Sequence, residues 1–360
     1  MSFRGRARGG ADVTSLLPRP PEGVLPEGDP LVSVEALTRH FPLGGRRSKN
    51  VVHAVDDVSF VLARGETLGL GGESGSGKST LARLMLHLDK PTSGRVVFEG
   101  KDIFETSDSE LRKLRREMQI VFQDPFASLN QRKTVEQIIS FPLRVHEPSL
   151  GRAERAARVR ELIDLVGLRQ EHARAYPRQL SGGQCQRVSI ARALALGPKL
   201  VVLDEAVSAV DVSIQAQILN LLKDLQSRLG LTYLFVTHDL AVVRYMASSI
   251  AVMYLGRVVE YGPREQLFES PRHPYTHALL AAIPPPPGVE PPPPLVLRDA
   301  PGAGTLPTGC RFHPRCPLGR REICHTVEPP LHEVASGHTV ACHFPQSAES
   351  LLAEAARETE

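Results

Sequence analysis

Short apolar runs alternate with amphipathic helical runs along most of the chain. LVSVEAL (31–37) and KLVVLDE (199–205) are typical of strands, whereas SIQAQILNLLKDLQSRL (213–229) is typical of a helix. Continuous apolar strands separated by helices predict a largely parallel sheet with both faces covered, and the mixed runs near the start predict an added antiparallel portion. A helix-rich middle extends from about Thr134 to Leu196. The pattern therefore predicts the α/β fold class.

Proline-rich stretches divide the chain. Residues 1–30 are rich in Pro, Gly and Arg and predict a flexible leader, and PPPPGVEPPPP (284–294) lies within a predicted stiff linker, residues 284–299. The boundaries predict a main domain over 31–283, a cysteine-containing extension over 300–346 and a tail over 347–360. We find no internal repeat of the length that a solenoid or propeller requires.

Composition and charge exclude several classes of protein. Apolar residues make up 41% of the chain and charged residues 23%, and the net charge is only +3, so we expect no nucleic acid partner. No run approaches the roughly 20 apolar residues of a membrane span, and no signal-peptide core follows the first ten residues. We therefore expect a cytoplasmic location, in which cysteine thiols stay reduced.

A phosphate-binding loop is the strongest chemical signal. GGESGSGKST (71–80) follows the apolar run ETLGLG and precedes a helical run, which is the strand–loop–helix context of a P-loop. In such a loop backbone N–H groups surround phosphates, Lys78 reaches the β- and γ-phosphates, and the Ser79 hydroxyl ligates Mg²⁺. The predicted ATP-binding residues of this loop are Ser74, Gly75, Ser76, Gly77, Lys78, Ser79 and Thr80.

Two carboxylates follow a second apolar strand. Asp204 and Glu205 end KLVVLDE, and by themselves they could be solvated strand ends. Given a P-loop upstream, we expect Asp204 to hold Mg²⁺ through water and Glu205 to orient and deprotonate the attacking water.

A second motif predicts another helix N-terminus that binds phosphate. LSGGQ (180–184) precedes an amphipathic run, so Ser181, Gly182 and Gly183 are expected at a helix N-terminus that suits a γ-phosphate. Further motifs are QIVFQDP with Gln123, SAVD with Asp211 and FVTHD with His238. With the P-loop and KLVVLDE, they make residues 31–283 resemble the nucleotide-binding subunit of an ABC transporter.

This resemblance implies a P-loop ABC ATPase with a RecA-like core, an antiparallel β subdomain, a helical signature subdomain over about 124–195 and a small cysteine-containing C-terminal extension. It also implies a head-to-tail dimer with a second ATPase, identical or homologous. The dimer would enclose two ATP molecules, and Ser181 would contact the ATP held by the P-loop of the other subunit. Gln123 would contact Mg²⁺ and water, His238 the γ-phosphate, and Asp211 the dimer partner.

One aromatic residue is a candidate adenine contact, and three residues differ from those common in the family. Phe41 matches the position of an aromatic that stacks on adenine, with core packing as the alternative role and His40 as the alternative contact. Gly71, Ala206 and Val210 depart from common family residues, but none removes a charge or ligand used in phosphoryl transfer.

Other segments resemble the oligopeptide and dipeptide importer ATPases. They are DPFASLNQRKTV (124–135), VSAVDVSIQAQILNLL (207–222) and ESPRHPYTHALLAAIP (269–284). That resemblance implies an ATPase at the cytoplasmic face of the membrane, beneath two permeases that receive peptide from an extracytoplasmic solute-binding protein. Import of another solute, such as nickel or a glutathione-like peptide, is an alternative, as are a non-transport ABC ATPase and an ATP-dependent regulatory module.

Four cysteines cluster near the C-terminus. Cys310, Cys316, Cys324 and Cys342 have wider spacing than most structural zinc sites. They are the ligands of a candidate [4Fe–4S] cluster, which needs four thiolates, and the tail resembles that of importer ATPases thought to carry one. Zinc with His313, His325 or His343 is an alternative, and reduced packing cysteines are another. Cys185, after LSGGQ, is expected to be an ordinary packing or exposed cysteine.

Overall fold

The computed structural model describes residues 30–42, 51–208, 210–283, 306–318 and 321–345, together with Leu297 and Ser350. The expected flexible leader, apart from Pro30, lies outside the described residues. The same is true of nearly all of the proline-rich linker and of the tail.

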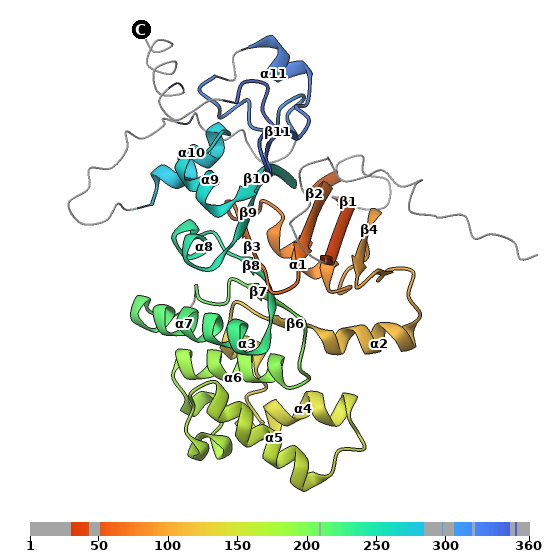
Figure 1. Ribbon diagram of the computed structural model, residues 1–360, viewed down its shortest axis with the longest axis vertical. Coiled ribbons are helices and arrows are strands. Elements are labelled where there is room, and N and C mark those ends of the chain that lie inside the picture. The colour runs from red at the N-terminus through yellow and green to blue at the C-terminus, as the bar shows by residue number, and fades with distance from the viewer. Residues whose placement is uncertain are drawn as a thin grey trace, which may run out of the picture.

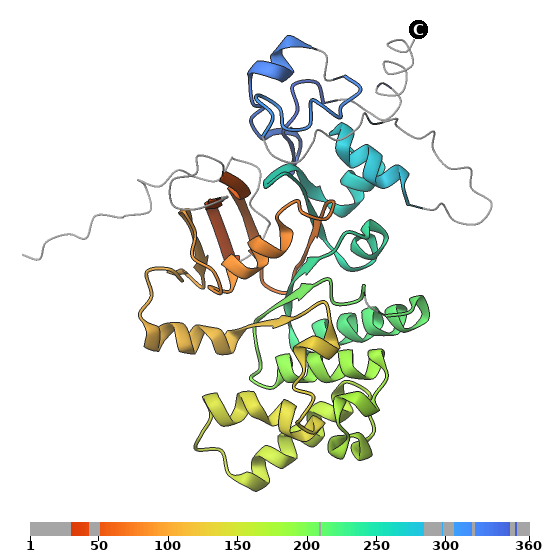
Figure 2. The ribbon, with the colours of Figure 1, turned by 180° about the vertical axis from the view of Figure 1, so that it is seen from behind.

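A long mixed sheet runs through the centre of the described chain (Figures 1 and 2). Its eight strands within the described residues follow the order β11-β12-β10-β9-β3-β8-β7-β6, and the run from β9 to β6 is parallel. The parallel strands are β3 (Thr67–Gly71), β6 (Met118–Val121), β7 (Leu200–Asp204), β8 (Thr232–Val236) and β9 (Ser249–Tyr254). The antiparallel strands at the other end are β10 (Arg257–Pro263), β11 (His332–Ala335) and β12 (His338–Val340).

A second, antiparallel sheet packs beside the first. Its order in the described residues is β2-β1-β4-β5. The strands are β1 (Pro30–Pro42), β2 (Val51–Ala63), β4 (Ser93–Phe98) and β5 (Lys101–Asp102). The antiparallel portion expected from the mixed early runs is therefore present.

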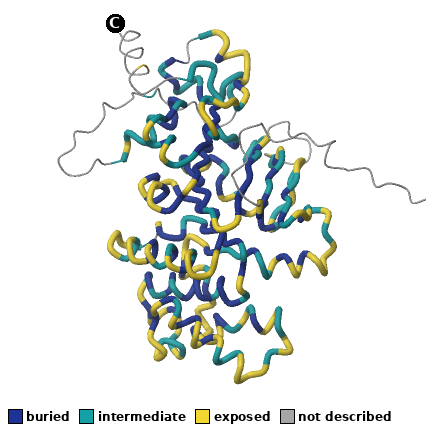
Figure 3. Tube along the Cα trace, viewed as in Figure 1, coloured by how far each residue is buried: buried dark blue, intermediate teal, exposed yellow. Residues whose placement is uncertain are grey.

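Two apolar cores lie on opposite faces of the parallel strands. Val201 and Leu203 of β7 pack with α7 (Val212–Leu229), whereas Leu200 and Val202 of the same strand pack with α1 (Lys78–Met85) and the antiparallel sheet. This alternation follows from the two-residue period of a strand, and it explains why KLVVLDE is apolar throughout: both faces are buried. Figure 3 shows the resulting buried centre.

Helices cover both faces of the central sheet and form the lower part of Figure 1. The helices around the sheet are α1 (Lys78–Met85), α2 (Asp108–Glu117), α3 (Pro125–Ser128), α7 (Val212–Leu229), α8 (Leu240–Met246), α9 (Arg264–Glu269) and α10 (Pro274–Ala281). The lower part contains α4 (Val135–His146), α5 (Arg152–Leu165), α6 (Gly182–Leu194) and two short 3₁₀ segments, η2 (Gln170–Arg174) and η3 (Pro177–Gln179). Helical structure thus fills the middle region where the sequence predicted it.

Capping residues fix where two of these helices begin. The Thr134 hydroxyl accepts from the Gln137 N–H at the start of α4, and the Ser181 hydroxyl accepts from the Gln184 N–H at the start of α6. In both helices the glutamine side chain also binds back to the cap residue, which completes a capping box.

The C-terminal cysteine region is built onto the main sheet. Strand β12 pairs with β10, so Val340 lies opposite Glu260, and the region adds only one short helix, α11 (Glu322–Thr326), among its described residues. The buried Glu260 carboxylate accepts from the backbone N–H groups of Arg272 and His273 and contacts His338 Nε2 at 2.7 Å. The sequence predicted the extension but not this continuation of the sheet.

The predicted α/β class is confirmed. No helix among the described residues has the length and apolar character that crossing a membrane requires.

Candidate functional site

The parallel strands bring four separated motifs to one edge of the sheet. β3, β8, β7 and β6 are neighbours and run in the same direction, so their carboxyl ends lie side by side. The P-loop follows β3, His238 follows β8, and Gln123 follows β6, while Asp204 ends β7 and Glu205 comes directly after it. Open α/β sheets bind ligands at this edge.

The P-loop holds a buried ammonium group. Lys78 is 4% exposed, and its Nζ donates to the carbonyl oxygens of Gly72 at 2.7 Å and Glu73 at 2.8 Å. Burial lowers the pKa of Lys78, whereas the nearby Glu205 and Asp204 carboxylates raise it. The loop thus places a cation among backbone groups at the start of α1, where phosphate oxygens would find positive charge.

Glycine is required at the last turn of the loop for steric reasons. Gly77 has a φ of 107°, and a Cβ there would lie 2.0 Å from the carbonyl oxygen of Ala54 on β2. Gly75 also has a positive φ of 81°, but no described atom lies within 4 Å of a Cβ built on it. Close packing against β2 therefore distinguishes these two glycines.

Two oxygen donors suited to Mg²⁺ are adjacent. The Ser79 hydroxyl donates to Asp204 Oδ1 at 3.0 Å. Burial raises the pKa of Asp204, and Glu205 adds to this rise, while the hydrogen bond from Ser79 opposes it. A hydroxyl beside a carboxylate is the hard-oxygen donor set that Mg²⁺ prefers, so these residues fit the ion.

Glu205 lies at the centre of the predicted catalytic residues. Its Oε2 accepts from Gln123 Nε2 at 2.7 Å, and its Oε1 lies 3.3 Å from His238 Nδ1. Glu205 has a φ of 48°, and its backbone N–H donates to the Val236 carbonyl oxygen of β8. The structure therefore brings Gln123, Glu205 and His238 together from three strands.

The signature residues lie in the helical part of the chain. Ser181 caps α6, Gly182 lies near Phe126 and Val210, and a Cβ on Gly183 would meet Ile214 of α7 at 2.4 Å. Asp211 caps α7. The signature residues do not line the cavity at the P-loop, so within one chain the two predicted phosphate sites remain separate.

A cavity of about 490 Å³ opens at the P-loop. P-loop residues and Glu205 line one side, and the remaining described lining residues are Val51, Val52, His53, Ala54, Leu255 and Leu306. Phe41, the predicted adenine contact, pairs with Val52 across the sheet and lies against the Arg39 guanidinium, 4.4 Å from ring centre to Cζ. It is not among the lining residues, and His53 and Leu306 were not singled out from the sequence.

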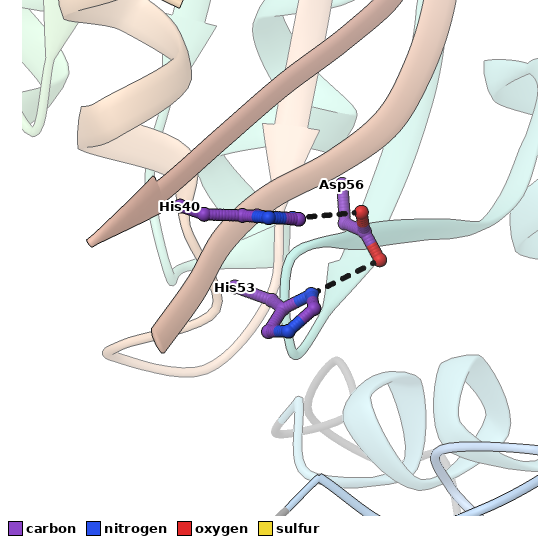
Figure 4. Close-up of side chains that lie close together, drawn as sticks. All are labelled: His40, His53 and Asp56. Atoms are coloured by element: carbon purple, nitrogen blue, oxygen red, sulfur yellow. Dashed lines mark hydrogen bonds and ion pairs between the residues drawn. The ribbon is translucent and has the colours of Figure 1, made fainter. Parts of the chain in front are cut away.

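A histidine pair shares one aspartate next to this cavity (Figure 4). His40 Nε2 and His53 Nδ1 lie 3.0 and 3.5 Å from the two carboxylate oxygens of Asp56. Their spacing would suit a metal ion. However, Arg311 and Arg257 also contact Asp56, so its charge is already balanced by two guanidinium groups. Burial raises the pKa of Asp56, but the hydrogen bonds from Arg311 and His40 lower it more, to well below its usual value.

The four C-terminal cysteines line one small cavity, together with His313 and His343. Burial raises the pKa of Cys316 and of Cys342 to about 12, and the neighbouring cysteines add to both shifts. Among the described residues, no three cysteine, histidine or carboxylate donors here lie within 4.8 Å of one another. Thiolates around a single zinc ion, each about 2.3 Å from it, would be closer than that.

Cys185 is separate from this cavity. It is fully buried in α6, and burial raises its pKa to about 11. Its expected packing role agrees with this burial.

Two contacts that reach the P-loop from much later in the chain were not predicted from the sequence. Arg315 contacts both carboxylate oxygens of Glu73, and the Glu73 N–H donates to the Tyr275 hydroxyl at 2.8 Å. The HPYT stretch that contains Tyr275 was informative only as a family resemblance.

Two family models match the chain. The model described as ABC transporter matches residues 55–208, and the model described as oligopeptide/dipeptide transporter, C-terminal region, matches residues 259–324. A probable peptide ABC transporter ATP-binding protein of Sinorhizobium fredii is 51% identical over 88% of this chain and 90% of its own length. The oligopeptide transport ATP-binding protein AppF of Bacillus subtilis is 46% identical over 87% of this chain and 97% of its own length.

A solved structure also matches. It is a dimeric ATP-binding cassette in a post-hydrolysis state with bound ADP and phosphate, with 33% sequence identity and a TM-score of 0.59. The match covers 65% of this chain and 98% of the cassette.

The contact between Gly77 and β2 generates a stability prediction. We expect Gly77→Ala to lower the free energy of unfolding, without nucleotide, clearly more than Gly75→Ala does. Both changes place alanine at a positive φ, which costs about 1–2 kcal/mol, but only the Gly77 change also forces Cβ against a backbone carbonyl. Chemical denaturation of the two variants measures the difference, and equal losses would contradict the packing argument.

Proposed function

The chain belongs to the ABC transporter ATPases that carry the oligopeptide/dipeptide transporter C-terminal region, and from this premise we propose that it hydrolyses ATP to power peptide import through membrane permeases. The observation that carries the proposal is the position of Glu205. Its carboxylate lies between Gln123 and His238 at the same sheet edge as the P-loop, where a water beside a bound γ-phosphate would be activated.

Each residue at this edge has a proposed task. Lys78 and the P-loop N–H groups bind the phosphates, and Glu205 accepts the proton of the attacking water. Gln123 orients that water and His238 contacts the γ-phosphate. Ser79 and Asp204, with Gln123, would hold Mg²⁺, which neutralises phosphate charge when bound.

Glu205→Gln tests the catalytic assignment. We expect hydrolysis, measured as phosphate release, to fall about 10²–10⁴-fold because the amide is a far weaker base, while ATP binding persists. Peptide uptake by cells that carry only this variant should fall with it. Glu269→Gln, an exposed carboxylate on α9, is the matched control and should hydrolyse ATP normally. Normal phosphate release by Glu205→Gln would contradict the assignment.

We further propose that two ATPase subunits associate head to tail, with Ser181 of each completing the other's site. Support comes from the start of α6, where Ser181 is exposed and lies outside the P-loop cavity of its own chain. A helix N-terminus that binds a γ-phosphate there would have to receive it from another subunit. The solved dimeric cassette is similar to this chain, which favours the same arrangement.

We propose that the ATPase dimer lies at the cytoplasmic face of the membrane and binds two permeases. These permeases would receive peptide from an extracytoplasmic solute-binding protein. The helical part offers exposed apolar side chains to a permease segment, among them Phe141 and Val145 of α4. ATP-driven closure of the dimer would then move the permeases.

Membrane fractionation tests these partners. We expect the protein in the membrane fraction of cells that contain the permeases and in the supernatant of matched cells that lack them. Detergent extracts of the first cells should yield both permeases with the ATPase. Recovery of the ATPase from membranes independently of any permease would contradict the proposed assembly.

We also propose that Cys310, Cys316, Cys324 and Cys342 hold a [4Fe–4S] cluster rather than zinc. Four thiols line one cavity, yet they are spread more widely than the ligands of a single zinc ion. A cluster binds each thiolate through a different iron and so accommodates a wider set of sulfur atoms.

Metal analysis after anaerobic purification tests this site. We expect about four iron and four sulfide per chain, and a clear loss of both in Cys316→Ser. Cys185→Ser changes a buried cysteine outside the cavity and should retain the full amount. Stoichiometric zinc, or no metal in the wild-type protein, would overturn the proposal.

A further inference from the structure

Glu73, at the start of the P-loop, is held at three points. Its carbonyl oxygen accepts from Lys78 Nζ, and its N–H donates to the Tyr275 hydroxyl. Its carboxylate accepts from both terminal nitrogens of Arg315, at 2.7 and 3.1 Å. Tyr275 belongs to α10 and Arg315 to the C-terminal region, and both lie more than 200 residues further along the chain than Glu73.

Arg315 is itself rigidly placed. Its N–H donates to the Phe312 carbonyl oxygen, and the Phe312 ring is 1% exposed and packs on Tyr254 and Tyr275, with ring centres 5.2 and 5.4 Å away. The next residue, Cys316, lines the cysteine cavity. The guanidinium is thus presented by a packed turn, and the Arg315 side chain is 15% exposed.

Glu73 presents an electrostatic problem to a phosphate ligand. It is an acidic residue within a loop that must attract anions, and its charge is felt by Lys78. A bidentate guanidinium neutralises the carboxylate and fixes its direction. Without Arg315, an unpaired negative charge would remain at the phosphate-binding loop.

We propose that Arg315 is a positioning residue for ATP, which neutralises Glu73 and holds the P-loop so that the C-terminal region sets the nucleotide affinity of its own subunit. This inference rests on the proposed binding of ATP at the P-loop. It assigns to the C-terminal region an action on the nucleotide in cis, in addition to any cluster that the region holds.

The same region also reaches the other end of the nucleotide cavity. Leu306 lines that cavity, and Arg311 contacts Asp56 on β2 and donates to the Leu255 carbonyl oxygen at 2.5 Å. The C-terminal region thus contacts both the phosphate end and the β2 end of the cavity, which favours an effect on affinity over a purely local packing role.

A double-mutant cycle on the full-length protein tests the proposal. We expect Arg315→Ala to raise the Kd for ATP about tenfold and to raise KM with little change in kcat, since the contact acts on binding. Arg315→Lys, which retains the charge, should recover much of the loss. Glu73→Gln should weaken binding less than Arg315→Ala, and adding Arg315→Ala to it should cost little more, because no carboxylate remains to be neutralised.

Salt provides a second readout. The Kd difference between Arg315→Ala and the wild type should narrow at about 0.5 M salt, because repulsion between Glu73 and phosphate is screened. Arg95→Ala breaks a similar two-nitrogen pair with Glu35 on the antiparallel sheet, outside the nucleotide cavity, and should leave the Kd unchanged.

Two results would overturn the inference: wild-type affinity in Arg315→Ala, or equal weakening by Arg315→Ala with and without Glu73→Gln. Each variant is first compared with the wild type by thermal unfolding. If Arg315→Ala does not fold, Arg315→Gln replaces it in the cycle with the same expectations. If the wild-type protein itself bound no ATP, the proposed function would fail instead, so the two failures are distinct.

Discussion

A loop that binds phosphate through its backbone N–H groups has to keep those groups available, so other parts of the protein must hold its shape. In this chain the shape is held by contacts around the loop. The Lys78 ammonium bridges two loop carbonyl oxygens, Gly77 packs on the Ala54 carbonyl, and the Gly256 N–H donates to the Ser76 carbonyl. The strands that flank the P-loop are therefore part of its structure.

The parallel direction of the strands places the other candidate site residues beside the P-loop. Because β3, β8, β7 and β6 are parallel neighbours, residues that lie far apart in sequence gather at one edge. Asp204 and Glu205 are consecutive, yet Asp204 faces Ser79 while Glu205 faces Gln123 and His238. One strand end thus presents its two carboxylates to different neighbours, which suits the two proposed tasks, ligation of a cation and activation of water.

Local motifs were predictable from the sequence, and long-range contacts were not. The P-loop, the end of β7 with Asp204 and the start of α6 each depend on a few consecutive residues, so their elements agree with the predictions. The convergence of four cysteines on one cavity was also expected from their clustering.

The features that the sequence did not predict depend on contacts between distant segments. The continuation of the sheet by β12 depends on register with β10, and the Arg315–Glu73 pair joins residues 242 positions apart. Val52 and His53 of β2 line the cavity, and the sequence did not single them out, whereas the adenine contact of Phe41 stays a prediction. Each of these features depends on how elements pack, which no single motif encodes.

The contact between Arg315 and Glu73 also has a consequence for biosynthesis. The ribosome makes the P-loop early and Arg315 some 242 residues later, which at about 5–20 residues per second is a delay of roughly 12–48 s. During that interval the nascent chain can form its first strands, but it lacks the segment that completes the support of the loop. The nucleotide site is therefore finished only after Arg315 has been made, and a chain terminated before Arg315 would carry every ATPase motif without that support.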